Sequence, residues 1–373
     1  MKNNISRRSF VTGTGSVALA AFLAGCSSSS DDSGSTSGSA SASTEESAGG
    51  HIYVLTNSED HGWTGSVATF AKEKIEEVND EGTYTAELQT ADAASDQITE
   101  IEDILAGDTS ELAGIVIQPL DDTVQSAIQS IIDAEVPYVA FDRIIEDVSD
   151  SAVSNVKGDN EGIGAGAAAY FVENGMQPGD AVYVYEGDTS SVTTLRDQGF
   201  EEYLTGQLEF DGSLIDESLM WTEDQLSSIT YSGSMEWSRS NVKEAYESLM
   251  GDESNATIKW FYSEDDEFSM GILEALDGGG ISDDIKEIIY ETQPFITGCG
   301  GLDEYYEVLR GNSYTDIVEN LGGVMSVTYS PSMIQLAIQD MVDYLNGEEV
   351  EQDHVIECEN VTPENVDEYE SFD

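Results

Sequence analysis

The stretch GIVIQPLDDTVQSAIQSIIDAEVPYVAFDR, residues 114–143, is the part of the sequence that indicates the fold class most clearly. Two short apolar runs, 115–117 and 137–141, lie on either side of a segment, 124–132, whose apolar residues recur at helical spacing. Near-continuous apolar runs are typical of strands in a parallel sheet that helices cover on both faces. The stretch therefore predicts one strand–helix–strand unit of an α/β protein.

The same alternation continues in both directions along the chain. Expected strands are 52–55, 114–117, 137–141, 181–185, 257–262, 288–290 and 295–297. Expected helices are 67–78, 98–105, 124–132, 162–172, 193–204, 240–250, 270–276 and 333–345. We interpret the two series, which meet near Asp159, as two doubly wound α/β lobes that face one another. In open α/β sheets ligands bind beyond the carboxyl ends of the strands, so two such lobes form a cleft that can close by hinge motion.

The composition is strongly acidic. The 373 residues include 75 acidic and 13 basic side chains, which gives a formal net charge of −62. Nucleic acid is excluded as a partner because phosphate binding needs a basic face, and the body of the protein should not bind an anionic membrane surface. Hydrophobic residues make up 39% of the chain and aromatic residues 9%, so the chain can form a core, and it is long enough for two domains.

The acidic residues are spread over nearly every segment. Their mutual repulsion should destabilise the compact state in dilute buffer, whereas about 1 M salt shortens the Debye length to roughly 3 Å. We interpret this composition as halophilic adaptation. A dedicated cation store is the weaker alternative.

The N-terminus contains the most specific local motif. Arg7 and Arg8 precede a short apolar stretch, and Leu-Ala-Gly-Cys ends at Cys26. The paired arginines resemble a twin-arginine export signal, and the second motif resembles a lipoprotein processing box that leaves Cys26 lipidated. We expect residues 1–25 to be a signal peptide and the Ser/Gly-rich residues 26–50 to be a flexible tether. The protein is then held at the extracytoplasmic face of the cell membrane. The alternative is a buried N-terminal helix with a chance cysteine.

Cysteines and histidines are few. Besides Cys26 the chain has only Cys299 and Cys358, which can pair in an oxidising compartment or remain thiols. The three histidines are widely spaced. The sequence therefore predicts no metal site, no cofactor and no histidine-based catalytic triad.

Charged and aromatic side chains follow the predicted strands. Asp142 and Arg143 come directly after the strand at 137–141, and Arg196 and Asp265 follow later strands. Trp63 and Trp237 lie near the same strand ends, and indole faces pack on the C–H faces of sugars. Guanidinium and carboxylate groups form directional hydrogen bonds. The set suits a neutral polyhydroxylated ligand. Alternatively, Arg143 forms a salt bridge with Asp142 or the neighbouring lobe, and the two tryptophans belong to the core.

Five segments, in this order, resemble the ribose- and galactose/glucose-binding family of extracytoplasmic solute-binding proteins, which serve ABC importers. They are Ile115–Pro119, Val136–Arg143, Gly158–Asn160 with the Gly/Ala-rich helix after it, Thr193–Phe200 and Asp265–Gly271. The resemblance covers nearly all of residues 51–350. It implies a type I periplasmic-binding-protein-like fold in which several crossing strands form the hinge. The N-terminal lobe would comprise 51–158 plus about 331–350, and the C-terminal lobe 159–330 plus about 351–373.

The resemblance also implies ligand-binding positions. These are Asp60, Trp63, Asp142 and Arg143 in the first lobe, with Arg196, Trp237, Asp265 and Tyr329. The sequence departs from the family where Gly300 replaces an expected Asp and Tyr329 replaces a common Gln or Asn. A further departure is the connection at 205–232, which is longer than usual.

The leading hypothesis is a lipid-anchored, monomeric binding protein. It would capture a monosaccharide or similar polyol and deliver it to an ABC permease and its ATPase, without being an enzyme. A nucleoside or other non-sugar ligand, or a sensory receptor role, is the alternative. A secreted glycoside hydrolase with paired carboxylates is a rival from another class.

Overall fold

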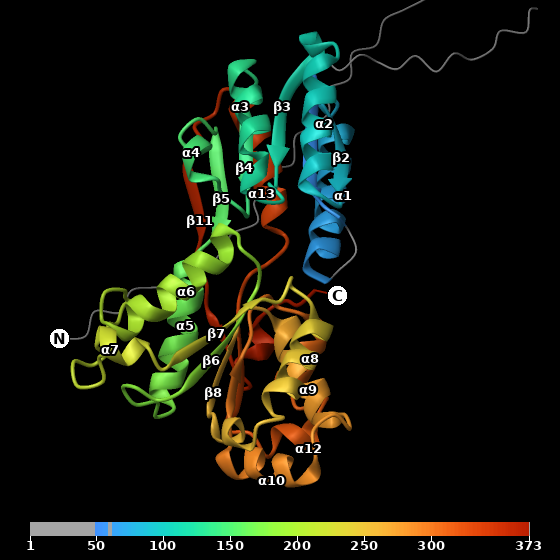
Figure 1. The fold of residues 1–373 in the computed structure, drawn as a ribbon. Coiled ribbons are helices and arrows are strands. Elements are labelled where there is room, and N and C mark those ends of the chain that lie inside the picture. Colours follow the sequence, from blue (N-terminus) through green and yellow to red (C-terminus); the bar gives the residue numbers. More distant parts are fainter. Residues whose placement is uncertain (1–48, 59–61, 373) are drawn as a thin grey trace, which may run out of the picture. The chain divides into compact units, whose positions relative to one another are not determined.

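The structure, a computed structural model, describes residues 49–58 and 62–372. The predicted export arginines Arg7 and Arg8, the predicted lipidation site Cys26 and the predicted ligand contact Asp60 lie outside the described residues, as does nearly all of the tether. In the described part of the chain the strands form two six-stranded sheets, each covered by helices (Figure 1). This confirms the α/β, doubly wound fold class predicted from the sequence.

The first sheet consists of parallel strands. Its strand order is β11-β5-β4-β3-β1-β2. The strands are β1 (His51–Asn57), β2 (Thr85–Ala91), β3 (Leu112–Ile117), β4 (Tyr138–Phe141), β5 (Ser154–Gly158) and β11 (Asp353–Ile356). The helices around it are α1 (Gly62–Glu81), α2 (Ala94–Ala106), α3 (Gln125–Asp133), α4 (Glu146–Ser149) and α13 (Met333–Leu345).

Successive residues of these strands belong to different cores, as expected for a sheet that is covered on both faces. Val54 of β1 packs in a cluster with residues of α1 and α13, whereas the next residue, Leu55, packs in a cluster with residues of α2 and α3. In Figure 1 the orange α13 lies among the blue and green elements of this lobe, which come from the N-terminal half of the chain. A C-terminal helix therefore completes the first lobe.

The second sheet has the order β12-β10-β9-β8-β6-β7. Its strands are β6 (Val182–Glu186), β7 (Ile229–Ser234), β8 (Trp260–Ser263), β9 (Phe295–Thr297), β10 (Gly323–Val327) and β12 (Asn360–Val361). Only the β10–β12 pair is antiparallel. Phe261 of β8 packs in one cluster, and its neighbours Trp260 and Tyr262 pack in the other.

Helices cover both faces of the second sheet as well. They are α5 (Asn160–Glu173), α6 (Ser191–Leu204), α7 (Glu223–Leu226), α8 (Arg239–Leu249), α9 (Asp266–Asp277), α10 (Asp283–Thr292), α11 (Asp303–Leu309) and α12 (Thr315–Val318). Short 3₁₀ turns occur at Thr109–Glu111, Asp122–Val124, Glu253–Thr257 and Val366–Glu368.

Within the described residues the chain passes from one sheet to the other between β5 and α5, between β10 and α13, and between β11 and β12. We call residues 158–160, 328–332 and 357–359 the hinge segments. They contain Tyr329, whose ring packs on the backbone of Gly158, because a Cβ at Gly158 would lie 2.3 Å from the ring. Two hinge segments are therefore in direct contact.

The sequence patterns did not predict strands β2, β5, β7, β10 and β12 or the short helices α4, α7, α11 and α12, and the structure differs from the expectation at two further places. The expected strand at 288–290 is wrong, because these residues lie in α10. Ile285, Ile288 and Ile289 recur at helical spacing, and Asp283 and Asp284 occupy the first turn, where acidic side chains favour a helix. The second difference is β11, which follows the lobe boundary expected near residue 350. It pairs in parallel with β5 and so extends the first sheet.

No helix in the described ranges is both long enough and apolar enough to cross a membrane.

Candidate functional site

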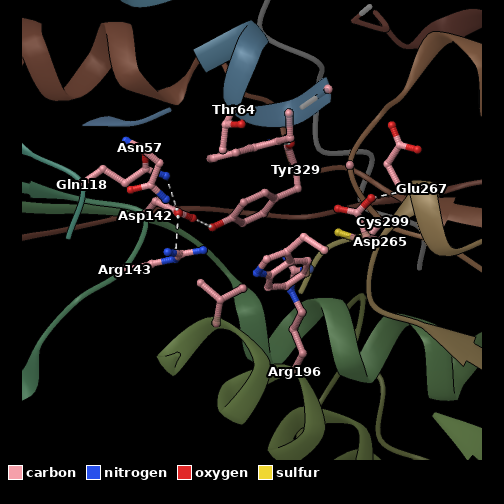
Figure 2. Close-up of a pocket in the computed structure, with 15 residues that line it drawn as sticks. Asn57, Thr64, Gln118, Asp142, Arg143, Arg196, Asp265, Glu267, Cys299 and Tyr329 are labelled. Carbon is pink, nitrogen blue, oxygen red and sulfur yellow. Dashed lines mark hydrogen bonds and ion pairs between the residues drawn. The ribbon is translucent and has the colours of Figure 1, made fainter. Parts of the chain in front are cut away.

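A cavity of about 80 Å³ lies where the carboxyl ends of the strands of both sheets meet. Its lining comes from both lobes and from the hinge (Figure 2). The lining residues are Asn57, Gly62, Trp63, Thr64, Gln118, Asp142, Arg143, Val192, Arg196, Trp237, Asp265, Glu267, Cys299, Gly300 and Tyr329.

Asp142 is held in an unusual backbone conformation immediately after β4. Its φ angle is 65°, in the left-handed region that non-glycine residues rarely adopt and that often marks a functional position. One carboxylate oxygen accepts a hydrogen bond from Gln118 Nε2 at 2.8 Å, and the other accepts one from the hydroxyl of Tyr329. Burial and the Asp142 carboxylate raise the pKa of Tyr329, so that hydroxyl remains protonated and donates.

Arg143 connects the two lobes. Its guanidinium donates to the backbone carbonyl of Leu120 in the first lobe and lies 3.0 Å from Oδ2 of Asp188 in the second. Burial alone would raise the pKa of Asp188, but Arg143 and the backbone N–H of Ser190, which donates to Oδ1 at 2.8 Å, help to outweigh it, and the pKa is lowered. Asp188 is therefore ionised at neutral pH, and the pair joins opposite charges across the site.

Trp63 packs in an aromatic group at the first-lobe side of the cavity. Its ring lies parallel to Phe141 with 6.2 Å between centroids, and 5.4 Å from the ring of Tyr329. The indole Nε1 donates to the backbone carbonyl of Tyr329 at 2.9 Å. The polar end of this tryptophan is thus bonded to a hinge segment.

Arg196 is 2% exposed and projects from α6 towards the cavity. Its guanidinium donates to Asn160 Oδ1 at 3.0 Å and to the backbone carbonyl of Glu264. The planar group lies 4.8 Å from the ring centroid of Tyr329 and 5.5 Å from that of Trp237, within cation–π range. The guanidinium is therefore fixed between two aromatic rings.

Trp237 faces the same guanidinium from the β7–α8 connection. Glu236 and Trp237 have φ angles of 52° and 53°, a strained conformation that the surrounding contacts must maintain. The indole lies against the backbone of Gly187, where a Cβ would be 2.1 Å from the ring, and stacks on Phe268. Gly187 is required here because only a residue without a side chain leaves room for the indole.

Two acidic side chains, the buried Glu264 and the half-buried Asp197, lie behind these groups. Glu264 Oε2 accepts hydrogen bonds from the backbone N–H of Gly187 at 2.8 Å and from Thr193 Oγ1 at 2.9 Å. Burial, followed by the neighbouring Asp197, raises the pKa of Glu264, and burial together with Glu186 raises the pKa of Asp197 to about 7. The backbone carbonyl of Glu264 also binds Arg196, so this pair helps to position the second-lobe side of the cavity.

Asp265 caps the N-terminus of α9. Its carboxylate accepts a hydrogen bond from the backbone N–H of Glu267 at 2.8 Å, and burial raises its pKa well above the ordinary value. This capping contact is local to the start of α9. Asp265 is also one of the residues that line the cavity.

The structure brings the sequence-predicted residues together. All of them except Asp60, which is not described, line this cavity. The alternatives considered for these residues also correspond to contacts in the structure. Arg143 forms an ion pair with the other lobe, and the indoles of Trp63 and Trp237 stack on aromatic rings. Sequence reasoning missed Asn57, Gln118 and Asp188 as site residues. Asn57 ends β1, Gln118 follows β3 and Asp188 lies two residues after β6, so a systematic reading of strand ends would have found them.

The cavity suits binding of a polar neutral solute better than catalysis. Its carboxylates and guanidinium groups are engaged by protein partners, while the indole and phenol rings offer apolar faces. Cys299, in the lining, and Cys358, in a hinge segment, are both thiols. Among residues 49–58 and 62–372, no group of three or more His, Cys, Asp or Glu side chains is placed to hold a metal ion.

Two sheet-based lobes, three hinge segments and one cavity between the strand ends define a two-lobed binding protein. The chain belongs to the periplasmic binding protein domain family, whose model matches residues 52–349. A search of curated proteins gives no match.

Many solved structures share the fold. A galactofuranose-binding protein is 19% identical, has a TM-score of 0.64 and matches 85% of this chain and 96% of its own. An ABC transporter solute-binding protein from Bacillus halodurans with bound myo-inositol is 19% identical, with a TM-score of 0.65 and coverage of 88% and 99%. A D-allose-bound protein from Actinobacillus succinogenes is 15% identical, with a TM-score of 0.64 and coverage of 86% and 100%. The family and these neighbours are solute-binding proteins and not enzymes, in agreement with the expectation from the sequence.

Proposed function

We propose that this protein captures a small neutral polyhydroxylated solute between its lobes and delivers it to an ABC-type permease. The observation that carries the proposal is the convergence of first-lobe Arg143, second-lobe Arg196 and hinge Tyr329 on one cavity. A ligand that contacts groups from both lobes favours the closed form, because those contacts exist together only when the lobes meet.

The lining favours a neutral ligand. Arg143 lies between two carboxylates, 3.9 Å from Asp142 and 3.0 Å from Asp188, so an added charge would find no unpaired partner of opposite sign among these three groups. Trp63, Trp237 and Tyr329 supply ring faces for C–H groups. Neighbours of the same fold were solved with arabinofuranose, myo-inositol and allose, all of which are neutral and rich in hydroxyl groups.

We further propose that the protein acts at the extracytoplasmic face of the membrane as a monomer, anchored through a lipid on Cys26. The support is the sequence: paired arginines, a short apolar stretch and the Leu-Ala-Gly-Cys motif, followed by a tether that leaves the binding lobes free to reach a permease and its ATPase. Binding, closure and docking would then form one sequence of events.

The test is a thermal-shift screen of the purified chain in about 2 M salt, where surface charges are screened. The panel contains polyols, pentoses, hexoses and nucleosides. A ligand present at 100 times its dissociation constant stabilises the folded state by about 2.7 kcal/mol, which raises the melting temperature measurably. A rise with a polyol or sugar that is recovered unchanged supports the proposal. A flat response from folded protein, or turnover of the ligand, contradicts it.

A further inference from the structure

We propose that Tyr329 sets an upper limit on ligand size and makes this site select polyols that are smaller than a six-carbon sugar or cyclitol. The inference rests on the proposed function, and it names the substrate class of the same cavity. Figure 2 shows the phenol ring at the centre of the lining residues, with its hydroxyl directed at Asp142. The ring is 6% exposed and so fills interior space between the lobes.

The ring is fixed from several directions. Arg196 lies 4.8 Å from its centroid, and the indole of Trp63 lies 5.4 Å away on another side. The backbone of Gly158 supports it so closely that a Cβ there would lie 2.3 Å from the ring. The backbone carbonyl of Tyr329 is held by Trp63 Nε1. These contacts hold the ring at its place in the cavity.

The hydroxyl of Tyr329 also takes a position that a ligand hydroxyl would otherwise take. Asp142 has two carboxylate oxygens, of which one accepts from Gln118 and the other from Tyr329. A carboxylate oxygen can accept more than one hydrogen bond, so Asp142 can still receive a small ligand at its edge. A large ring that approached Asp142 face-on would have to displace the phenol.

The remaining volume agrees with a small ligand. Ligand pockets commonly measure about 300–1,000 Å³, whereas this cavity measures about 80 Å³. A cavity this far below the usual range suits a polyol that is smaller than a hexopyranose.

The experiment compares binding of a size series by calorimetry in about 2 M salt, which screens the surface charge. The probes are glycerol, erythritol, D-ribose, D-galactose and myo-inositol. The proteins are the unaltered chain, Tyr329→Asn, which removes the ring, and Tyr329→Phe, which keeps the ring and loses the hydroxyl. We expect the unaltered chain to bind glycerol or erythritol, and we expect both the unaltered chain and Tyr329→Phe to exclude D-galactose and myo-inositol. Tyr329→Asn should gain about tenfold or more for galactose or inositol, the scale on which a pocket discriminates by size.

The outcomes separate this inference from the proposed function. If the unaltered chain binds galactose or inositol as tightly as Tyr329→Asn does, the size limit is wrong, although the polyol-binding function stands. If no probe binds either folded protein, the proposed function fails and the inference fails with it. Should Tyr329→Asn not fold, the size series on the unaltered chain still decides, because binding of any six-carbon probe overturns the limit.

Discussion

Arg143 illustrates how one side chain can serve both architecture and binding. It follows β4 in the first lobe, it is bonded to Leu120 of that lobe, and it reaches Asp188 of the other at 3.0 Å. Removing one partner of a desolvated, hydrogen-bonded charge pair is expensive, because the other charge remains buried without compensation. The residue should therefore affect closure over the ligand more than folding of either lobe.

We expect Arg143→Ala to weaken ligand binding by about 2 kcal/mol or more, roughly 30-fold, through loss of the interlobe ion pair and of a ligand contact. Calorimetric titration with the ligand found in the screen measures this effect. Arg310→Ala is the matched control, because Arg310 pairs with Glu307 and Asp367 and does not line the cavity. Unchanged affinity in Arg143→Ala would show that the arginine has no part in binding.

At the scale of elements, the contact between α5 and α6 places Arg196. A Cβ at Gly164 of α5 would lie 1.9 Å from the backbone carbonyl oxygen of Arg196, and a Cβ at Gly199 of α6 would lie 1.9 Å from that of Glu161. Only glycine allows the two helix backbones to come this close. Close helix packing thus explains the Gly/Ala-rich sequence of α5. The same packing determines where the guanidinium group of Arg196 lies in the cavity.

Gly199→Ala should lower the free energy of unfolding by about 1–3 kcal/mol, because the added methyl group forces the helices apart. It should also weaken ligand binding, since Arg196 moves with α6. Chemical denaturation and titration provide the two measurements. Gly279→Ala provides the control, because nothing lies within 4 Å of a Cβ at Gly279. Equal stability of the two variants would contradict close packing of α5 on α6.

At the scale of the whole molecule, the acidic residues affect the stability of the fold in two ways, through repulsion at the surface and through carboxyl groups inside the protein. The formal net charge of −62 produces repulsion across the surface, which salt screens. Inside the protein, burial raises the pKa of Asp266 to about 6 and that of Asp197 to about 7, although Ser326, Gly301 and Leu302 donate hydrogen bonds to Asp266. Salt has little access to buried groups, so the two routes can be told apart.

The direction of the pH effect follows from linkage. Between the ordinary carboxyl pKa near 4 and the raised values of about 6 and about 7, the folded state binds more protons than the unfolded state does. Stability should therefore fall as the pH rises through this range. In dilute buffer the growing surface charge adds to the fall, whereas in about 2 M salt the part due to the buried carboxylates remains.

Asp197→Asn should make the high-salt pH profile of the melting temperature less steep between about pH 4 and pH 7, because the amide does not ionise and only the contribution of Asp266 remains of the two. The exposed Asp103→Asn is the control and should keep the slope of the unaltered protein. A slope in Asp197→Asn as steep as in that control would mean that Asp197 does not take up a proton on folding.

The sequence alone determined the α/β class, because apolar runs at strand length and apolar spacing at helix length are local patterns that burial imposes on both faces of a parallel sheet. It also indicated most of the candidate site. Asp142, Arg143 and Arg196 follow strands, and parallel strands bring their carboxyl ends to one edge. Local periodicity was insufficient at 288–290, where a short apolar run suits a strand and a helix equally.

Only the tertiary structure decided which distant segments meet. The Tyr329–Asp142 hydrogen bond joins positions 187 residues apart, and the pairing of β11 with β5 joins residues near 353 to residues near 155. No local pattern specifies such contacts, since they depend on how two sheets and three hinge segments pack together. In the sequence Tyr329 is only a residue of the connection after β10. The same packing places its ring at the centre of the cavity, because Gly158 leaves room for it.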